Sequence, residues 1–168
     1  IKLKQPILTN QDMVRLRSYK GKGFQHKTLP ILFDVEEGVN GMQKSLDDLC
    51  AQVENLVSQG VTILILSDRG VSESKARIPA LLASAAVHHH LMRIKQRTRI
   101  SLVVESGEPR EIHHYAVLFG FGVAAINPWL AFDIIDRRSV EDGFEGSEDR
   151  EGLADHYIKA IGQGLLKI

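Results

Sequence analysis

The sequence predicts an α/β fold in which a parallel sheet is built from repeated strand–helix units. Three unbroken apolar runs, at residues 61–66, 100–104 and 123–126, have the character of strands that are buried on both faces. Each run is followed by a polar turn and then by a stretch whose apolar residues recur with helical spacing. Because a strand, helix, strand order needs a crossover connection, consecutive strands should run parallel.

Two architectures suit this pattern: part of a (β/α)₈ barrel (a partial, TIM-barrel-like fold) and an open, doubly wound, three-layer sheet. A complete barrel takes about 250 residues, so a chain of 168 residues would form only a partial one. Both architectures gather functional side chains at the carboxyl ends of the strands. We expect the partial barrel and keep the open sheet as the alternative.

Apolar spacing, together with glycine and proline positions, predicts four strands and six helices. The first strand is expected at Leu29–Val35, ahead of the three apolar runs. The helices are expected at residues 12–19, 40–60, 79–94 and 109–120, from Pro128 onward, and at 153–167. Asn40 is expected to be an N-cap, Pro109 to take the first helical position, and Gly120 to form a left-handed C-terminal cap.

The chain is expected to form a single α/β domain over residues 1–168, with an N-terminal arm at 1–28 and a charged loop at 136–152. Residues 136–152 are mostly charged and almost free of apolar side chains, a composition typical of a solvated loop or a disordered segment. The first residue is Ile rather than Met, so we expect a fragment of a longer protein.

Composition argues against several classes of protein. Lys plus Arg and Asp plus Glu both number 21, so the basic excess typical of nucleic-acid-binding proteins is missing. No apolar run approaches the roughly 18 residues of a membrane-spanning helix. The single cysteine, Cys50, excludes an internal disulfide and an all-cysteine cluster within this chain. We therefore expect a reducing compartment and neither a nucleic acid nor a membrane as partner.

Polar side chains stand at the predicted carboxyl ends of the strands. They are Asp34, Ser67, Asp68, Arg69, Glu105, Ser106 and Asn127. The loop Ser67–Gly70 is the most site-like segment, because its Ser, Asp and Arg suit binding of a small anion or pairing across an interface. A plain surface turn with an Asp68–Arg69 pair is an equally good interpretation. These residues make up no complete catalytic set.

Two histidine clusters raise a metal-binding hypothesis. His88–His90 and His113–His114 are consecutive, and consecutive residues of a helix point about 100° apart. The i, i+4 spacing with which a helix holds a metal ion is missing. A site between helices, formed by His89, His114 and Glu105, would make the chain a free-standing α/β metalloenzyme. The alternative is that the histidines form hydrogen bonds at a helix end or an interface.

Several segments resemble the central domain of the glutamate synthase large subunit. They are Ile65–Val71, Ile78–Leu91 with its triple histidine, Arg99–Ile135, and the stretch from Tyr157 to Lys167. The triple histidine and the Val-Val-Glu-Ser-Gly-Glu run at 103–108 are specific features. The resemblance extends from about Pro6 to the end of the chain.

The resemblance implies a division of labour within a larger enzyme. An amidotransferase domain releases ammonia from glutamine, and the ammonia crosses an internal passage. A domain with FMN and a 3Fe-4S cluster then reduces the imine formed from 2-oxoglutarate, and the product is glutamate. The central domain has an α/β fold related to the barrel-like FMN domain, joins the two active sites and helps shape the passage.

For this chain the resemblance implies no catalytic residue, cofactor or metal of its own, and inactivity in isolation. Its partners would be the amidotransferase and FMN-binding domains of the same polypeptide, in the cytoplasm or, in a plant, the plastid. The candidate interface or passage residues are Ser67, Asp68, Arg69, Glu105, Ser106 and Asn127.

The helix at 79–94 and the turn at 105–108 are expected to face neighbouring domains. The first half of that helix is apolar nearly all round, which a helix with one exposed side rarely is. The same apolar patch would allow the isolated chain to self-associate. The competing expectation is that the arm, residues 1–24, buries this helix within the chain.

Overall fold

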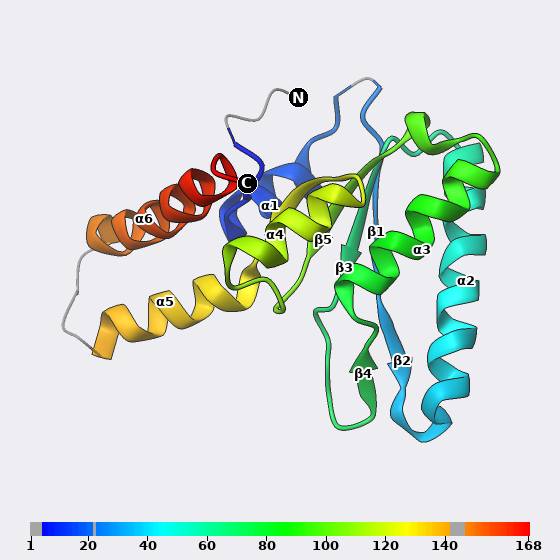
Figure 1. The fold of residues 1–168 in the computed structure, drawn as a ribbon, viewed down its shortest axis with the longest axis horizontal. Helices are drawn as coiled ribbons and strands as arrows, with labels where there is room; N and C mark the ends of the chain where they lie inside the picture. The colour runs from blue at the N-terminus through cyan, green and yellow to red at the C-terminus, as the bar shows by residue number, and fades with distance from the viewer. Residues whose placement is uncertain (1–4, 22, 142–146) are drawn as a thin grey trace.

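A four-stranded parallel sheet organises the structure, a computed structural model that describes residues 5–21, 23–141 and 147–168. Its strands are β1 (His26–Pro30), β3 (Ile63–Ser67), β5 (Ser101–Glu105) and β6 (Val123–Asn127), hydrogen-bonded in that order and all parallel. Figure 1 shows β1, β3 and β5 side by side in the middle of the molecule. The predicted parallel pairing of the three apolar runs is confirmed.

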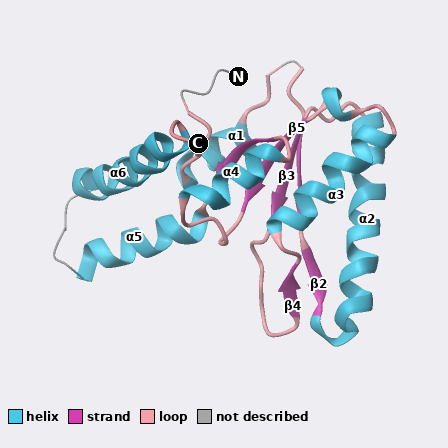
Figure 2. Cartoon of the chain, in the orientation of Figure 1, coloured by secondary structure: helices cyan, strands magenta, loops and turns pink. Residues whose placement is uncertain are grey.

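Three crossover helices cover one face of this sheet. They are α2 (Gly38–Ser58), α3 (Ala80–Arg93) and α4 (Ile112–Gly120), and Figure 2 shows them flanking the strands. Val53 of α2, Val87 of α3 and Leu118 of α4 pack in one core with Leu64 and Leu102 of the sheet. These alternate sheet residues point to the helical side because successive side chains of a strand face opposite ways.

The N-terminal arm covers part of the opposite face. Helix α1 (Asn10–Ser18) begins with a capping box between Thr9 and Asp12 and buries Met13 in a second apolar cluster with sheet residues such as Ile65. Ahead of α1, Ile7 forms a parallel bridge with Ile126, so the arm also runs along the edge of β6. The described part of the arm therefore belongs to the folded core.

The order of the strands decides between the two predicted architectures. They lie across the sheet in chain order, and their crossover helices share one face. Consecutive units of a (β/α)₈ barrel have this arrangement, whereas a doubly wound sheet reverses its strand order at a switch point and carries helices on both faces. The α/β prediction is confirmed, and the chain order favours the partial barrel; the described strands do not close on themselves.

A small antiparallel sheet beyond the carboxyl ends of β1 and β3 differs from the prediction. It pairs β2 (Leu32–Asp34) with β4 (Lys75–Arg77), and Figure 1 shows both strands beyond the end of the main sheet. The single predicted strand Leu29–Val35 is therefore wrong. Its first part pairs with β3, which ends at Ser67, and its second part pairs with β4, which follows β3 in the chain.

Three predicted helix boundaries are also wrong. Asn40 lies inside α2, which begins at Gly38 after a 3₁₀ turn at Val35–Glu37. Pro109 stands three residues ahead of α4, in a loop. The glycine in the left-handed conformation is Gly122, with φ of 77°, whereas Gly120 still belongs to α4. A second 3₁₀ turn, Arg97–Arg99, leads into β5.

Two helices follow β6, α5 (Trp129–Glu141) and α6 (Ser147–Leu165), and they lie side by side at one end of the molecule in Figure 1. The predicted charged loop at 136–152 is therefore wrong at 136–141 and 147–152; residues 142–146 lie outside the described part. Glu and Arg favour helix, so charge alone does not end one. No helix in the described ranges is both long and apolar enough to cross a membrane.

Candidate functional site

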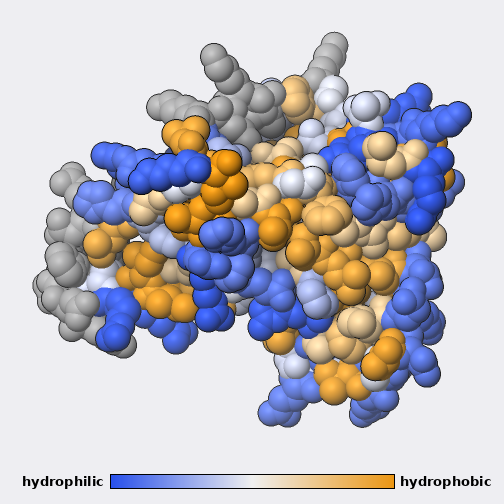
Figure 3. Space-filling model, in the orientation of Figure 1, coloured by the Kyte–Doolittle hydropathy of each residue, from blue (hydrophilic) through white to orange (hydrophobic). Residues whose placement is uncertain are grey.

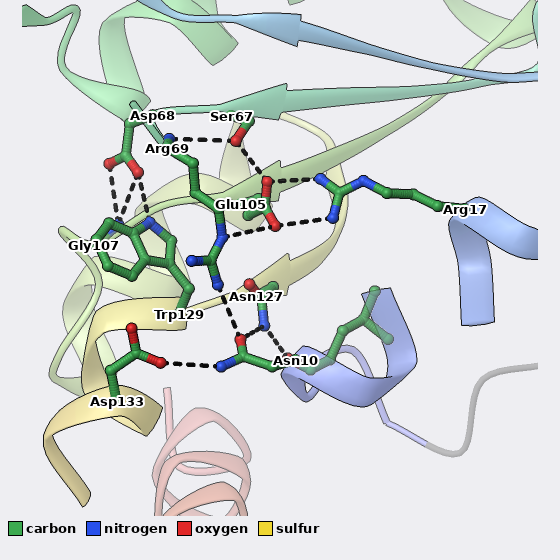
Figure 4. A network of polar contacts seen from close by, with 11 residues as sticks. Asn10, Arg17, Ser67, Asp68, Arg69, Glu105, Gly107, Asn127, Trp129 and Asp133 are labelled. Atoms are coloured by element: carbon green, nitrogen blue, oxygen red, sulfur yellow. Dashed lines mark hydrogen bonds and ion pairs between the residues drawn. The ribbon is translucent and has the colours of Figure 1, made fainter. Parts of the chain in front are cut away.

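The carboxyl ends of the sheet strands meet in register at one edge. Pro30 pairs with Ser67, Ser67 with Glu105, and Glu105 with Asn127, so these four residues form one row across the sheet. Ser67, Glu105 and Asn127 are all buried. The structure thus brings together the strand-end residues selected from the sequence, and Figure 4 shows them converging from separate strands. Asp34 is the exception, since it pairs with Lys75 at 2.8 Å on the small antiparallel sheet.

Glu105 is the centre of this edge, and its side chain is only 1% exposed. Arg17 of α1 binds both of its oxygens, Nη1 to Oε1 at 3.1 Å and Nη2 to Oε2 at 2.7 Å. Arg69 donates from Nε to Oε1 at 3.1 Å, and the Ser67 hydroxyl donates to Oε2. Burial by itself raises the pKa of Glu105, but the hydrogen bonds from Arg17 and Ser67 and the charges of both arginines outweigh it and hold the pKa below its usual value.

Asp68 forms a second cluster beside the first and is also 1% exposed. Its carboxylate accepts hydrogen bonds from the Ser106 hydroxyl at 2.7 Å, the Gly107 N–H at 2.9 Å and the Trp129 indole N–H at 2.6 Å. Arg77 approaches it at 3.8 Å. Buried polar groups need hydrogen-bond partners, and these donors satisfy both oxygens of the Asp68 carboxylate. Asp68 therefore joins β3, the turn after β5 and α5.

Asn127 connects the same edge to the arm. Its amide nitrogen donates to the Leu8 carbonyl at 2.8 Å and to Asn10 Oδ1 at 3.1 Å, while its Oδ1 has no hydrogen-bond partner among the described residues. Asn10 also receives a contact from Arg69 at 3.4 Å and donates to Asp133 of α5 at 3.1 Å. The Asn10 side-chain amide thus links the arm to the loop after β3 and to α5.

This arrangement is better suited to holding the neighbouring elements together than to catalysis. A carboxylate held between two guanidinium groups stays ionised, so Glu105 is a poor proton donor or acceptor near neutral pH. The Ser67 hydroxyl donates to that same carboxylate and so lacks an effective base. The Arg69 side chain is bonded to Glu105 and lies 4.6 Å from the centroid of the Trp129 ring, so it is not a free anion-binding group.

Several residues of this network were outside the sequence prediction. Arg17, Asn10 and Trp129 contact the edge from α1 and α5. The Thr9–Asp12 capping box is a signal that could have located the start of α1, and hence the helix face that carries Arg17. Nothing in the sequence indicates that this arginine reaches a strand 88 residues away.

The structure does not bring together His89, His114 and Glu105, the residues of the metalloenzyme hypothesis. His89 lies against Phe121 with ring centroids 5.9 Å apart, and His114 accepts a hydrogen bond from the Arg110 N–H at 3.2 Å. Glu105 is taken up by its arginines. Within residues 5–21, 23–141 and 147–168, no group of three or more His, Cys, Asp or Glu side chains is placed to hold a metal ion.

The other histidines of the triple cluster bond to their surroundings. His90 Nε2 lies 3.1 Å from Glu54 Oε2 and links α3 to α2. His88 accepts a hydrogen bond at Nδ1 from Arg97 Nε at 3.1 Å, and its pKa is lowered by burial and by the charge of Arg97. These contacts agree with the interpretation that the histidines form hydrogen bonds at a helix end or an interface.

Comparison with known proteins identifies relatives along the whole chain. The family model described as "Glutamate synthase central domain" matches residues 1–168. The chain is 37% identical over 168 residues to the glutamate synthase [NADPH] large chain of Bacillus subtilis, and the match covers 100% of this chain and 11% of that protein. It is 32% identical over 175 residues to the glutamate synthase [NADH] of Saccharomyces cerevisiae, covering 99% and 8%.

A further relative is named for ferredoxin. The chain is 33% identical over 178 residues to the ferredoxin-dependent glutamate synthase of Antithamnion sp., a match that covers 100% of the chain and 11% of that protein. The chain thus spans about a tenth of the length of the curated relatives it matches.

Proposed function

Because the chain belongs to the glutamate synthase central domain family, we propose that it connects the glutaminase site and the FMN-containing synthase site of a glutamate synthase large chain. The complete enzyme would make glutamate from glutamine and 2-oxoglutarate, and this domain would help shape the passage along which ammonia moves. Relatives named for NADPH, NADH and ferredoxin share the domain, which supports a role that does not depend on the electron donor.

The observation that carries this proposal is the closed polar network at the carboxyl edge of the sheet. In a barrel enzyme this edge holds the catalytic groups. Here the carboxylates of Glu105 and Asp68 are buried and satisfied by donors of the same chain. Ser67, Asp68, Arg69, Glu105, Ser106 and Asn127 would then act as a rigid edge of an interface or passage and not as reacting groups.

The cofactors of the proposed parent enzyme would be held elsewhere in the polypeptide. A 3Fe-4S cluster needs cysteine ligands, and this chain has one cysteine, Cys50, which is half-buried on α2. Burial raises the pKa of its thiol, which opposes formation of the thiolate that binds metal. The residues present do not fit a cluster, and we assign FMN and the 3Fe-4S cluster to other domains.

Helix α3 supplies a surface for a neighbouring domain. Leu82 is 40% exposed and Leu81 36%, while Val87 is fully buried against the sheet. Because Leu81 and Leu82 stay exposed with the described part of the arm in place, the competing expectation that the arm buries α3 is wrong. Figure 3 shows hydrophobic side chains gathered over the middle of the face on which α3 and α4 lie, with hydrophilic groups beside them. Apolar surface of this kind usually marks a partner.

The inner face of the sheet offers a second surface. A cavity of about 1140 Å³ opens beside the arm, with Leu16, Phe24, Ile63 and Val103 in its wall. In a complete barrel this face would be covered by side chains from further strands. The arm buries Ile65 and Ala125 on this face but leaves the cavity open beside it, which supports the view that the domain is completed by other parts of the polypeptide.

The substitution Leu82→Lys in the complete enzyme tests the proposal. A lysine here should weaken contact between domains without entering a buried core. We expect glutamine hydrolysis to persist, while glutamate formation from glutamine falls more than glutamate formation from added ammonia. The matched control is Leu166→Lys, the same change at a side chain that is 90% exposed. Equal loss of both glutamate-forming activities, or no loss of either, would contradict the connecting role.

A further inference from the structure

A cleft between the start of α3 and helix α4 has a wall of mixed chemistry. Its volume is about 530 Å³, and Arg77, Arg110, His114, Leu81, Pro109 and Val117 are among the residues that line it. Leu81 and Val117 stay 36% and 44% exposed at this position. A small-molecule site encloses its ligand, so large exposed apolar groups beside arginines are more typical of a surface that receives a polypeptide segment.

The carboxylates near this cleft already have partners within the chain. Glu108 Oε2 accepts the Ala80 N–H at 2.6 Å, and Glu111 lies 3.6 Å from His114 Nε2. Asp68, which Arg77 approaches at 3.8 Å, is satisfied by three closer donors. Because these carboxylates already have partners, donor groups of Arg77 and Arg110 stay available to a ligand.

Arg110 is the strongest of these available groups. Its backbone N–H donates to His114 and its carbonyl accepts from Tyr157, which fixes the position of the residue. Its guanidinium group makes no hydrogen bond or ion pair with any of the described residues. An arginine that is fixed at its backbone and free at its guanidinium suits two-point binding of an incoming carboxylate.

We propose that this cleft binds an acidic segment with an adjacent apolar side chain, contributed by a part of the same polypeptide outside residues 1–168. The carboxylate would pair with Arg110 beside Arg77, and the apolar side chain would cover Leu81 and Val117. About nine-tenths of a relative such as the Bacillus subtilis protein lies outside the matched region, so most of the polypeptide is available to supply the segment. The inference rests on the proposed connecting role and names the chemistry of one contact.

Zero-length cross-linking in the complete enzyme tests this contact. The substitution Arg110→Lys keeps the positive charge and introduces a primary amine, which a carbodiimide joins to a carboxylate only when the two groups touch. We expect mass spectrometry to find Lys at position 110 linked to an Asp or Glu outside residues 1–168. The matched control is Arg93→Lys, at the exposed end of α3 that lies away from the cleft, which should give no such link.

The outcomes separate this inference from the broader proposal. Links confined to residues 1–168, whether within one molecule or between two copies, would overturn the contact, and so would the absence of any link. If Leu82→Lys uncouples the two activities but position 110 gives no link to another domain, the connecting role stands and the acidic contact fails. If the link forms but Leu82→Lys changes nothing, the contact stands and the connecting role fails.

Discussion

Replacing Glu105 by glutamine should destabilise the chain strongly, although the two side chains have almost the same shape. Glu105 is 1% exposed and receives the guanidinium groups of Arg17 and Arg69. Removing one member of a buried ion pair typically costs about 3–5 kcal/mol, because the remaining charge loses its partner. The arginines are 34% and 42% exposed and can turn toward water, so we expect a loss at the lower end, about 3 kcal/mol.

Urea unfolding of residues 1–168, followed by circular dichroism, measures this loss. With a denaturant dependence of about 2 kcal/mol per molar urea, a loss of 3 kcal/mol lowers the midpoint by about 1.5 M. Glu54→Gln is the matched control, since Glu54 is 51% exposed and forms an ion pair with His90. An exposed pair of this kind contributes less than about 1 kcal/mol.

The pH dependence of stability distinguishes the loss of an ion pair from a change in packing. Because the pKa of Glu105 is lowered in the folded state, its contribution is fully present above the unfolded carboxyl pKa of about 4.3 and is lost as the pH falls through the folded value. The difference in unfolding free energy between the wild type and Glu105→Gln should therefore shrink from pH 7 toward pH 3. A difference below about 1 kcal/mol at pH 7, or one that does not change with pH, would refute the role of the ion pairs.

Three further predictions concern the core, a turn and the bound groups. Leu102→Asp should abolish cooperative unfolding, because it puts an unpaired carboxylate at a side chain that is fully buried between β3 and β6. Gly122→Ala should lower the unfolding free energy by about 2 kcal/mol, because this glycine has φ of 77° and an added Cβ would lie 2.7 Å from His88 Nδ1. The control Gly120→Ala, at a position with open space around it, should not lower it. Purified residues 1–168 should carry no stoichiometric flavin, metal or cluster; absorbance spectra and metal analysis check this, and one zinc or flavin per chain would contradict it.

The parallel sheet could be predicted because its signal is local. Residues 61–66, 100–104 and 123–126 are continuous apolar runs, and such runs point to strands that are covered on both faces. The row of Ser67, Glu105 and Asn127 followed from the same reasoning, since parallel strands place their carboxyl ends at one edge. The sequence did not indicate which groups each side chain would contact at that edge.

The parts that the sequence did not reveal depend on contacts between distant segments. Arg17 reaches Glu105 across 88 residues, and no local pattern indicates that contact. The β2–β4 pair forms between segments that were predicted as one strand and one loop, and three-residue strands are too short to show a period. The charged segment at 136–152 was predicted as a loop from composition, but charged residues such as Glu and Arg are good helix formers.

The contacts of the arm explain why a sheet edge without reacting groups should still matter to the enzyme we propose. Several links fasten the arm to β5 and β6: Ile7 bridges to Ile126, Asn127 donates to the Leu8 carbonyl, and Arg17 binds Glu105. Among these named links the Arg17 contact is the ionic one, and it is the one that the Glu105→Gln variant weakens. If the domain holds the two active sites in position relative to each other, that variant should loosen the arm in the complete enzyme. Glutamate formation from glutamine should then fall more than either glutamine hydrolysis or glutamate formation from added ammonia. A stable sheet with a loosened arm would then separate the role of the ion pair in coupling from its role in folding.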